Sequence, residues 1–172
     1  MKKSTSAPGR AALLNIKILV LDNDPRMLGL VQGILSDLGF KHVFTGSDGK
    51  EGLSILDKEQ VHLIITDWTM QPMDGIDFVK RVRSLPDAFY RVIPIILLTA
   101  RAEEEDVIAA RDAGVTEFIA KPFTVKRLVD RIIAVVDNPR NFVLAPNFRG
   151  HDRRRRDDNS QGGIEKRKRR KA

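Results

Sequence analysis

Four short polar segments of the chain carry residue types that could bind a cation and a phosphoryl group. They are Asp22-Asn23-Asp24-Pro25, Asp67-Trp68-Thr69-Met70, Thr99-Ala100-Arg101 and Lys121-Pro122-Phe123. Oxygen ligands without histidine or cysteine are what a hard cation such as Mg²⁺ prefers. A lysine beside them supplies a point charge suited to a phosphoryl group. The residue types therefore predict a cation site that handles phosphate, provided that the fold brings the segments together.

Each polar segment directly follows a short apolar run. The predicted strands are Ile18–Leu21, His42–Thr45, Leu63–Thr66, Ile93–Leu98 and Glu117–Ala120. The third and fourth are nearly continuous in Ile and Leu, which is typical of strands covered on both faces of a sheet. The four polar segments follow the first, third, fourth and fifth of these strands.

Helical patterns separate the strands. Apolar residues recur on one helix face over 27–38 and, more regularly, over 125–136. Other helices are predicted near Gly49–Glu59, from Asp74 to before Pro86, and over Ala102–Ala113. Strands that alternate with helices predict an α/β fold with right-handed βαβ units and a parallel sheet. In such sheets ligands collect at the carboxyl ends of the strands, so we expect the polar segments to share one rim.

The charge distribution divides the chain into three parts. The net charge of the 172 residues is +7, made up of +3 over residues 1–15, −3 over 16–136 and +7 over 137–172. We expect a flexible leader over 1–15, one domain over 16–136 and a largely disordered basic tail over 137–172, in which two basic runs repel internally. Because the domain itself is mildly acidic, its composition excludes a uniformly basic nucleic-acid-binding module.

Composition also restricts the class of protein. The chain has no cysteine, which excludes disulfides, thiolate metal sites and cysteine catalysis. No apolar run approaches the ~18–20 residues of a membrane helix, and the basic start is followed by Ser, Thr, Pro and Gly rather than by a secretory signal. We therefore expect a soluble, cytoplasmic protein without a membrane span.

The motifs together resemble the receiver domain of bacterial two-component response regulators, in particular stand-alone, chemotaxis-regulator-like receivers. They are ILVLDNDP (18–25), DWTMQPMDG (67–75), LTAR (98–101) and KPF (121–123), in matching order and spacing over about residues 16–136. The resemblance implies a flavodoxin-like, doubly wound (βα)5 sheet with strand order 2-1-3-4-5. It also implies phosphoryl transfer from a histidine kinase or phosphotransfer protein, with Mg²⁺ or Mn²⁺ as cofactor, and a response through altered protein–protein binding.

The resemblance assigns roles in the transfer to individual residues. Asp67 matches the phosphoacceptor, whose carboxylate attacks phosphorus to form an aspartyl phosphate. Lys121 matches the phosphate-binding lysine, and Thr99 the hydroxyl that turns toward the phosphoryl group. Phe118 matches the switch aromatic, without the hydroxyl of a tyrosine. Such a protein catalyses its own phosphorylation and slow dephosphorylation, and is not a conventional enzyme.

The expected metal ligands are Asp22, Asn23, Asp67 and the backbone carbonyl of Thr69. Asn23 departs from the family pattern, in which a second carboxylate is more common, so weaker metal binding is expected. Pro72 is displaced by one residue from the commonest family arrangement.

Several alternatives stay open from the sequence. Asn23 is compatible with a receiver-like binding module that works without phosphorylation, and the basic tail with an adaptor that contacts nucleic acid or an acidic partner weakly. Asp22-Asn23-Asp24-Pro25 could be only a turn before a helix, Asp67 an ordinary loop aspartate, and Phe118 a fixed core residue. The downstream partner is not identified by the sequence.

Overall fold

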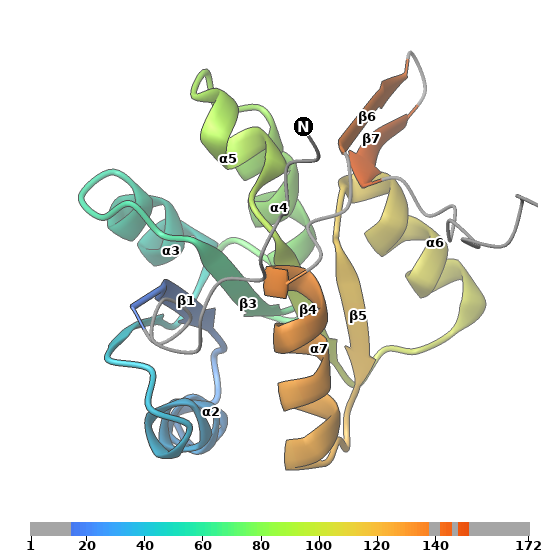
Figure 1. Cartoon of the computed structure of the whole chain (residues 1–172). Helices are drawn as coiled ribbons and strands as arrows, with labels where there is room; N and C mark the ends of the chain where they lie inside the picture. The colour runs from blue at the N-terminus through green and yellow to red at the C-terminus, as the bar shows by residue number, and fades with distance from the viewer. Residues whose placement is uncertain (1–14, 138–141, 146–147, 152–172) are drawn as a thin grey trace, which may run out of the picture.

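The central element of the protein is a five-stranded parallel sheet (Figure 1). The structure, a computed structural model, describes residues 15–137, 142–145 and 148–151. The strands are β1 (Lys17–Leu21), β2 (His42–Gly46), β3 (Leu63–Asp67), β4 (Ile95–Thr99) and β5 (Glu117–Ala120). Their order is β2-β1-β3-β4-β5, and every neighbouring pair is parallel. The predicted α/β class and the strand order 2-1-3-4-5 are confirmed.

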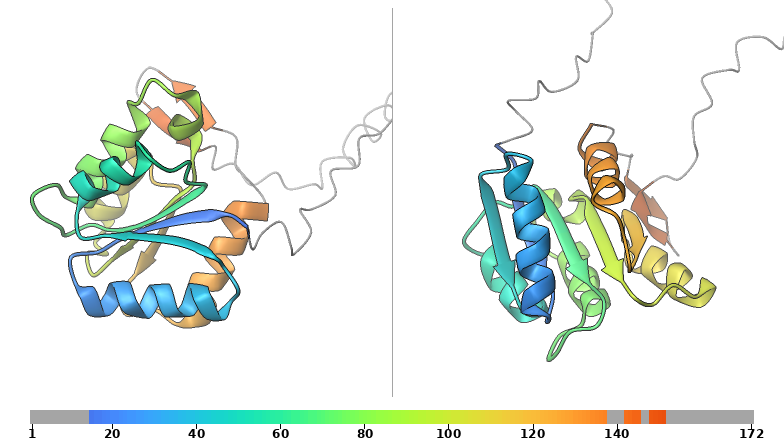
Figure 2. Two further views of the ribbon diagram at one scale, coloured as in Figure 1. Left: turned by 90° about the vertical axis from the view of Figure 1, so that its left-hand side faces the viewer. Right: turned by 90° about the horizontal axis from the view of Figure 1, so that it is seen from below.

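Helices cover both faces of the sheet (Figure 2). They are α2 (Pro25–Asp37), α3 (Gly49–Leu56), α4 (Gly75–Arg83), α5 (Ala88–Val92), α6 (Glu104–Ala113) and α7 (Val125–Asp137). Buried residues of α2 and α7 pack on one face, and those of α3, α4, α5 and α6 on the other. In β1, Ile18 and Val20 belong to the first cluster and Leu19 and Leu21 to the second. Alternate side chains of one strand thus enter two separate cores.

The region before β4 differs from the sequence prediction. The strand begins at Ile95 rather than at Ile93, and the short helix α5 precedes it. Asp87 caps this helix by accepting a hydrogen bond from the backbone N–H of Phe89 at 2.8 Å. Pro94 has no N–H to give to a strand ladder, although its carbonyl accepts from Ile64. Ile93 is only 2% exposed, so its apolar character reflects packing after a helix and not strand pairing.

The region after α7, predicted to be largely disordered, contains two short strands. β6 (Phe142–Ala145) and β7 (Phe148–His151) form an antiparallel pair, separated by two residues in sequence, and the backbone of β7 lies against α6. A two-residue connection is the commonest hairpin spacing, and the run Phe-Val-Leu favours a strand. The rest of the predicted tail, at 138–141, 146–147 and 152–172, lies outside the described residues, as does the predicted leader up to residue 14.

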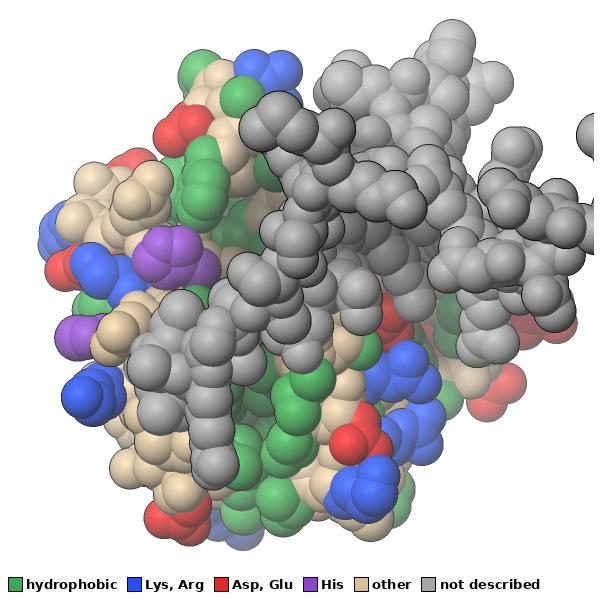
Figure 3. Space-filling model, viewed as in Figure 1, with side chains coloured by type: hydrophobic (Ala, Val, Ile, Leu, Met, Phe, Trp, Pro, Cys, Tyr) green, Lys and Arg blue, Asp and Glu red, His purple; other side chains and the backbone are tan. Residues whose placement is uncertain are grey.

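The surface of the described domain mixes charges of both signs. On the face shown in Figure 3, acidic and basic side chains lie beside one another. Charges of opposite sign also pair along α7, where Arg131 contacts Glu117 of β5 and Lys126 contacts Asp130. Within the described range, no helix is long and apolar enough to cross a membrane.

Gly75 allows the start of α4 to approach the end of β3. Its backbone N–H donates to the carbonyl of Trp68 at 2.8 Å, and a Cβ atom at position 75 would lie 1.9 Å from the backbone oxygen of Asp67. Two atoms cannot occupy that distance, so any side chain at this position must displace the strand end that carries Asp67. The glycine is needed for close approach of two backbone segments.

We expect Gly75→Ala to destabilise the domain by about 1–3 kcal/mol, because the backbone and not a flexible side chain must move. The matched control is Gly33→Ala in the exposed part of α2, where an added Cβ meets nothing within 4 Å. The free energy of unfolding of the control should rise by about 0.5–1 kcal/mol, because alanine has a higher helix propensity than glycine. Urea unfolding of both variants measures the difference. Equal stability of the two variants would contradict the close-approach role of Gly75.

Candidate functional site

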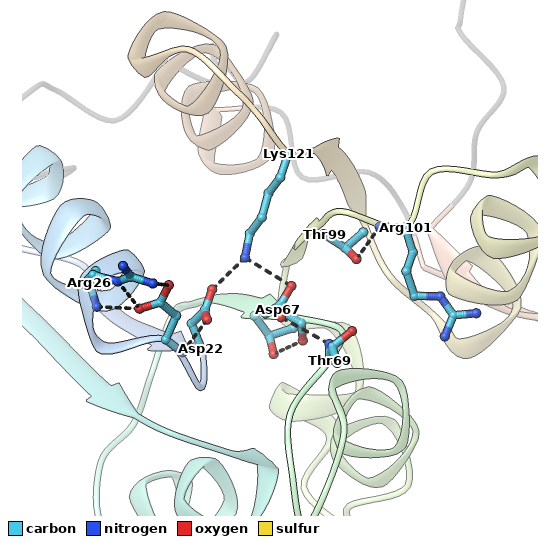
Figure 4. Close-up of polar contacts among 9 residues, drawn as sticks. Asp22, Arg26, Asp67, Thr69, Thr99, Arg101 and Lys121 are labelled. Atoms are coloured by element: carbon cyan, nitrogen blue, oxygen red, sulfur yellow. Dashed lines mark hydrogen bonds and ion pairs between the residues drawn. The ribbon is translucent and has the colours of Figure 1, made fainter.

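Four of the predicted site residues meet at the carboxyl ends of the strands (Figure 4). Asp67 and Thr99 are the last residues of β3 and β4, while Asp22 and Lys121 directly follow β1 and β5. The chain runs from β1 outward to β2 and returns on the other side to β3, so strand order reverses between β1 and β3. Asp22 and Asp67 stand at this reversal point, where ligands of such sheets bind.

The ammonium group of Lys121 joins the two carboxylates. Its Nζ lies 2.7 Å from Oδ2 of Asp22 and 3.3 Å from Oδ1 of Asp67. All three side chains are largely withdrawn from solvent: the exposed fraction is 17% for Lys121, 4% for Asp22 and 9% for Asp67. Two carboxylates and one ammonium leave a formal charge of −1 in a partly desolvated space. A cation entering this space would be attracted more strongly than at the open surface.

Asp22 is oriented by the backbone that follows it. Its Oδ1 accepts a hydrogen bond from the N–H of Asp24 at 2.9 Å, which leaves Oδ2 for Lys121. Asp24 itself caps α2 by accepting from the N–H of Arg26, and hydrogen bonds from Arg26 lower the pKa of Asp24. The segment is thus both a turn before a helix and a source of one site carboxylate.

Asp67 is buried, and its ionised form is disfavoured. Its Oδ2 accepts from the N–H of Thr69 at 3.2 Å, and its backbone oxygen accepts from the hydroxyl of Thr66. Burial raises the pKa of Asp67; attraction by Lys121 opposes this, and repulsion by Asp22 adds to it. The carboxylate would therefore gain from a further positive charge.

Thr99 is fully buried and tied to both neighbouring loops. Its Oγ1 accepts from the N–H of Arg101 at 3.0 Å, and its backbone oxygen accepts from the N–H of Lys121 at 2.8 Å. Phe118 of β5 is half-buried, packs against the core on the α3–α6 side, and lines a groove with Val107 and Val115. Its proposed switching stays a prediction.

The oxygen donors present suit a hard cation with few protein ligands. Asn23 and Thr69 are exposed beside the two carboxylates, and offer an amide oxygen and a backbone carbonyl. No group of three or more His, Cys, Asp or Glu residues spaced for a metal occurs among the residues that the structure describes. Mg²⁺ accepts such a sparse set because it keeps several of its waters. The residues therefore fit Mg²⁺ better than a metal that needs a full protein cage.

One cluster at the rim was not predicted from the sequence. The guanidinium of Arg101 lies 4.4 Å from the centre of the Trp68 ring and pairs with Asp106 of α6 at 2.6 Å. We name these three residues the Arg101 cluster. The sequence contained one usable signal, because β3 and β4 are neighbours and the residues that follow them must also be neighbours. Asp106, five residues after Arg101, gave no separate signal.

Comparison with known proteins gives one family. The model of the response regulator receiver domain matches residues 18–133. The chemotaxis protein CheY-3 of Vibrio cholerae is 37% identical over 118 residues, which cover 69% of this chain and 89% of that protein. The structure of V. cholerae chemotaxis protein CheY4 superposes with a TM-score of 0.66 at 31% identity, over 70% of this chain and 98% of that one.

A more distant structure shares the fold alone. The receiver domain of sensor histidine kinase PA1611 from Pseudomonas aeruginosa has a TM-score of 0.65 at 24% identity, over 71% of this chain and 98% of that one. That protein is described with a magnesium ion coordinated in its active site cleft.

The raised pKa of Asp67 predicts a pH-dependent stability difference for Asp67→Asn. The folded protein holds the Asp67 proton more tightly than the unfolded chain, so this carboxyl favours folding below its ordinary pKa of 3.8 and loses that contribution as pH rises through the raised value. At pH 7 the asparagine variant should therefore be more stable than the wild type. The advantage should shrink as the pH falls toward 3.8. Chemical unfolding of both proteins between pH 7 and pH 3.8 measures the stability difference. A difference that grows on acidification would contradict the raised pKa of Asp67.

Proposed function

The chain belongs to the response regulator receiver domain family, and we propose that it works as a stand-alone response regulator that accepts a phosphoryl group on Asp67. The donor would be the phosphohistidine of a histidine kinase or phosphotransfer protein. The observation that carries this proposal is the contact of one ammonium, that of Lys121, with the carboxylates of both Asp22 and Asp67. This arrangement supplies a nucleophile, a phosphate-binding cation and a metal-binding carboxylate at one point.

The reaction forms one bond and breaks one. A carboxylate oxygen of Asp67 attacks phosphorus, and the P–N bond to the donor histidine breaks, with its electron pair returning to the ring nitrogen. A donor ring protonated on its other nitrogen leaves as neutral imidazole. The product is a mixed anhydride, the aspartyl phosphate. Lys121 would neutralise charge on the phosphoryl oxygens, and such charge stabilisation with positioning accounts for most catalysis of this kind.

We propose Mg²⁺ as the cofactor, held by Asp22, Asp67, the amide oxygen of Asn23 and the backbone carbonyl of Thr69. When bound, the cation offsets the negative charge of the carboxylates and of the transferring phosphoryl group. The support for this lies in the donor set of the chain and in its formal charge of −1. The chain's own residues orient the site: the N–H of Asp24 fixes Asp22, and the N–H of Thr69 fixes Asp67.

The response would be a change in protein binding. Phosphorylation adds about −1.5 to −2 charge next to Asp67. Thr99 and Lys121 would follow that charge, and Phe118 would repack between the core and the groove against α6. Such a change shifts the population between two arrangements of the α6–β5–α7 face, and the downstream partner would bind one of them better.

Phosphorylation is tested with a small phosphodonor, acetyl phosphate, and Mg²⁺. The wild type should gain one phosphoryl mass, and Asp67→Asn should gain none. The matched control is Asp77→Asn, an exposed aspartate in the first turn of α4, which should be modified like the wild type. Intact mass spectrometry measures the adduct. Absence of an adduct on the wild type under forcing conditions would leave the alternative of a binding module that works without phosphorylation.

The role of Asn23 is tested by restoring a carboxylate. Asn23→Asp makes the formal charge of the site −2, and we expect Mg²⁺ to bind about tenfold more tightly. Trp68, the only tryptophan of the chain, directly follows Asp67 and gives a fluorescence signal for the titration. Asp77→Asn serves again as the control and should bind Mg²⁺ like the wild type. An unchanged affinity of Asn23→Asp would show that residue 23 does not face the cation.

A further inference from the structure

The Arg101 cluster connects three segments of the chain at the site rim. Trp68 directly follows Asp67 after β3, Arg101 stands two residues after Thr99 at the end of β4, and Asp106 lies in the first turn of α6. The Arg101 guanidinium is over the Trp68 ring and is ion-paired with Asp106. Trp68 is only 7% exposed and the Asp106 side chain only 12%, so both partners are fixed by packing. The guanidinium of Arg101 is thereby held on one face by the Trp68 ring and at one N–H edge by the Asp106 carboxylate.

The backbone of Arg101 acts on Thr99. The Arg101 N–H donates to Oγ1 of Thr99 at 3.0 Å, so one acceptor position of that hydroxyl is occupied. A threonine hydroxyl also has one hydrogen to donate, and its direction is restricted once the oxygen is bonded from one side. Figure 4 shows the Arg101 guanidinium directed away from Asp67, while its N–H faces Thr99. Arg101 can therefore influence the reaction without touching the phosphoryl group.

We infer that Arg101 is a positioning residue for phosphoryl transfer, an inference that rests on the proposed function. Its side chain fixes the loop after β4 against the loop after β3, and its backbone then keeps the Thr99 hydroxyl ready to donate to a phosphoryl oxygen on Asp67. Donors that are oriented before the reaction lower the barrier, because no reorientation is needed as charge develops. The stacking of Arg101 on Trp68 thus supports catalysis from outside the reacting centre.

The test compares rates of adduct formation from acetyl phosphate and Mg²⁺. Arg101→Ala should slow the maximal rate about three- to tenfold and leave the donor concentration for half-maximal rate unchanged, because a positioning effect acts on the reaction and not on donor binding. Arg101→Lys keeps the charge but not the planar stacking, so it should restore only part of the rate. The matched control is Arg111→Ala in α6, the helix that carries Asp106. It removes an exposed ion pair between Arg111 and Asp112 and should react like the wild type.

Asp106→Asn tests whether the ion pair acts through Arg101. Asp106→Asn should slow adduct formation, as Arg101→Ala does. The double variant should be no slower than the slower of the two single variants, because both substitutions remove the same ion pair. Acrylamide quenching of Trp68 fluorescence should increase in Arg101→Ala before any donor is added. That measurement reports the stacking independently of phosphorylation.

The outcomes separate this inference from the proposed function. An adduct on the wild type with an unchanged rate in Arg101→Ala overturns the inference alone. Additive effects of Arg101→Ala and Asp106→Asn overturn it as well. A lower melting temperature of Arg101→Ala without a rate change, measured where the variant is fully folded, indicates a structural role and overturns the positioning role. Absence of an adduct on the wild type overturns the proposed function, and this inference with it.

Discussion

The site depends on one electrostatic balance: two aspartates from neighbouring strands are held together by one lysine from the far edge of the sheet. Asp22 and Asp67 repel each other at the ends of β1 and β3, and that repulsion contributes to the raised pKa of Asp67. Lys121 reaches both carboxylates from the end of β5, two strands away from β3. The parallel arrangement brings these groups to one rim, because the carboxyl ends of all five strands point the same way.

The same balance is the reason why we expect Asn23 to affect the proposed cation binding. With an asparagine at this position the site carries two carboxylates and one ammonium, so its formal charge is −1. A third carboxylate, at position 23, would strengthen attraction for a divalent cation but would also raise the repulsion that Lys121 must offset. If Asn23 faces the cation as we propose, the site would bind the cation less tightly, and the repulsion between its carboxylates would be smaller when no cation is bound. The proposed function needs only that cation binding still stabilise ionised Asp67.

The sequence predicted most of what position along a parallel sheet can determine. Short apolar runs that alternate with helical patterns located the strand ends at which Asp22, Asp67 and Lys121 meet, since residues just past parallel strands must share a rim. It missed interactions that depend on side-chain direction or on contact between distant segments, such as the stacking of Arg101 on Trp68. It also missed the close approach of Gly75 to β3. A glycine before a helix has many possible causes, and only three-dimensional packing distinguishes them.

Two separate sets of contacts lead from this rim to α6. The first set runs from Trp68 through Arg101 to Asp106, which lies in the first turn of α6. The second set joins β5 to α6, because Phe118 of β5 and Val107 of α6 line the same groove. An added phosphoryl charge would act on the contacts of Arg101 with Trp68 and Asp106 through Thr99. It would act on the groove that Phe118 lines through Lys121 and β5. Because β7 also lies against α6, a shift of this helix would alter a surface that the chain's own C-terminal hairpin contacts. The size of that shift is limited by how much better the phosphoryl group is bound in one arrangement than in the other.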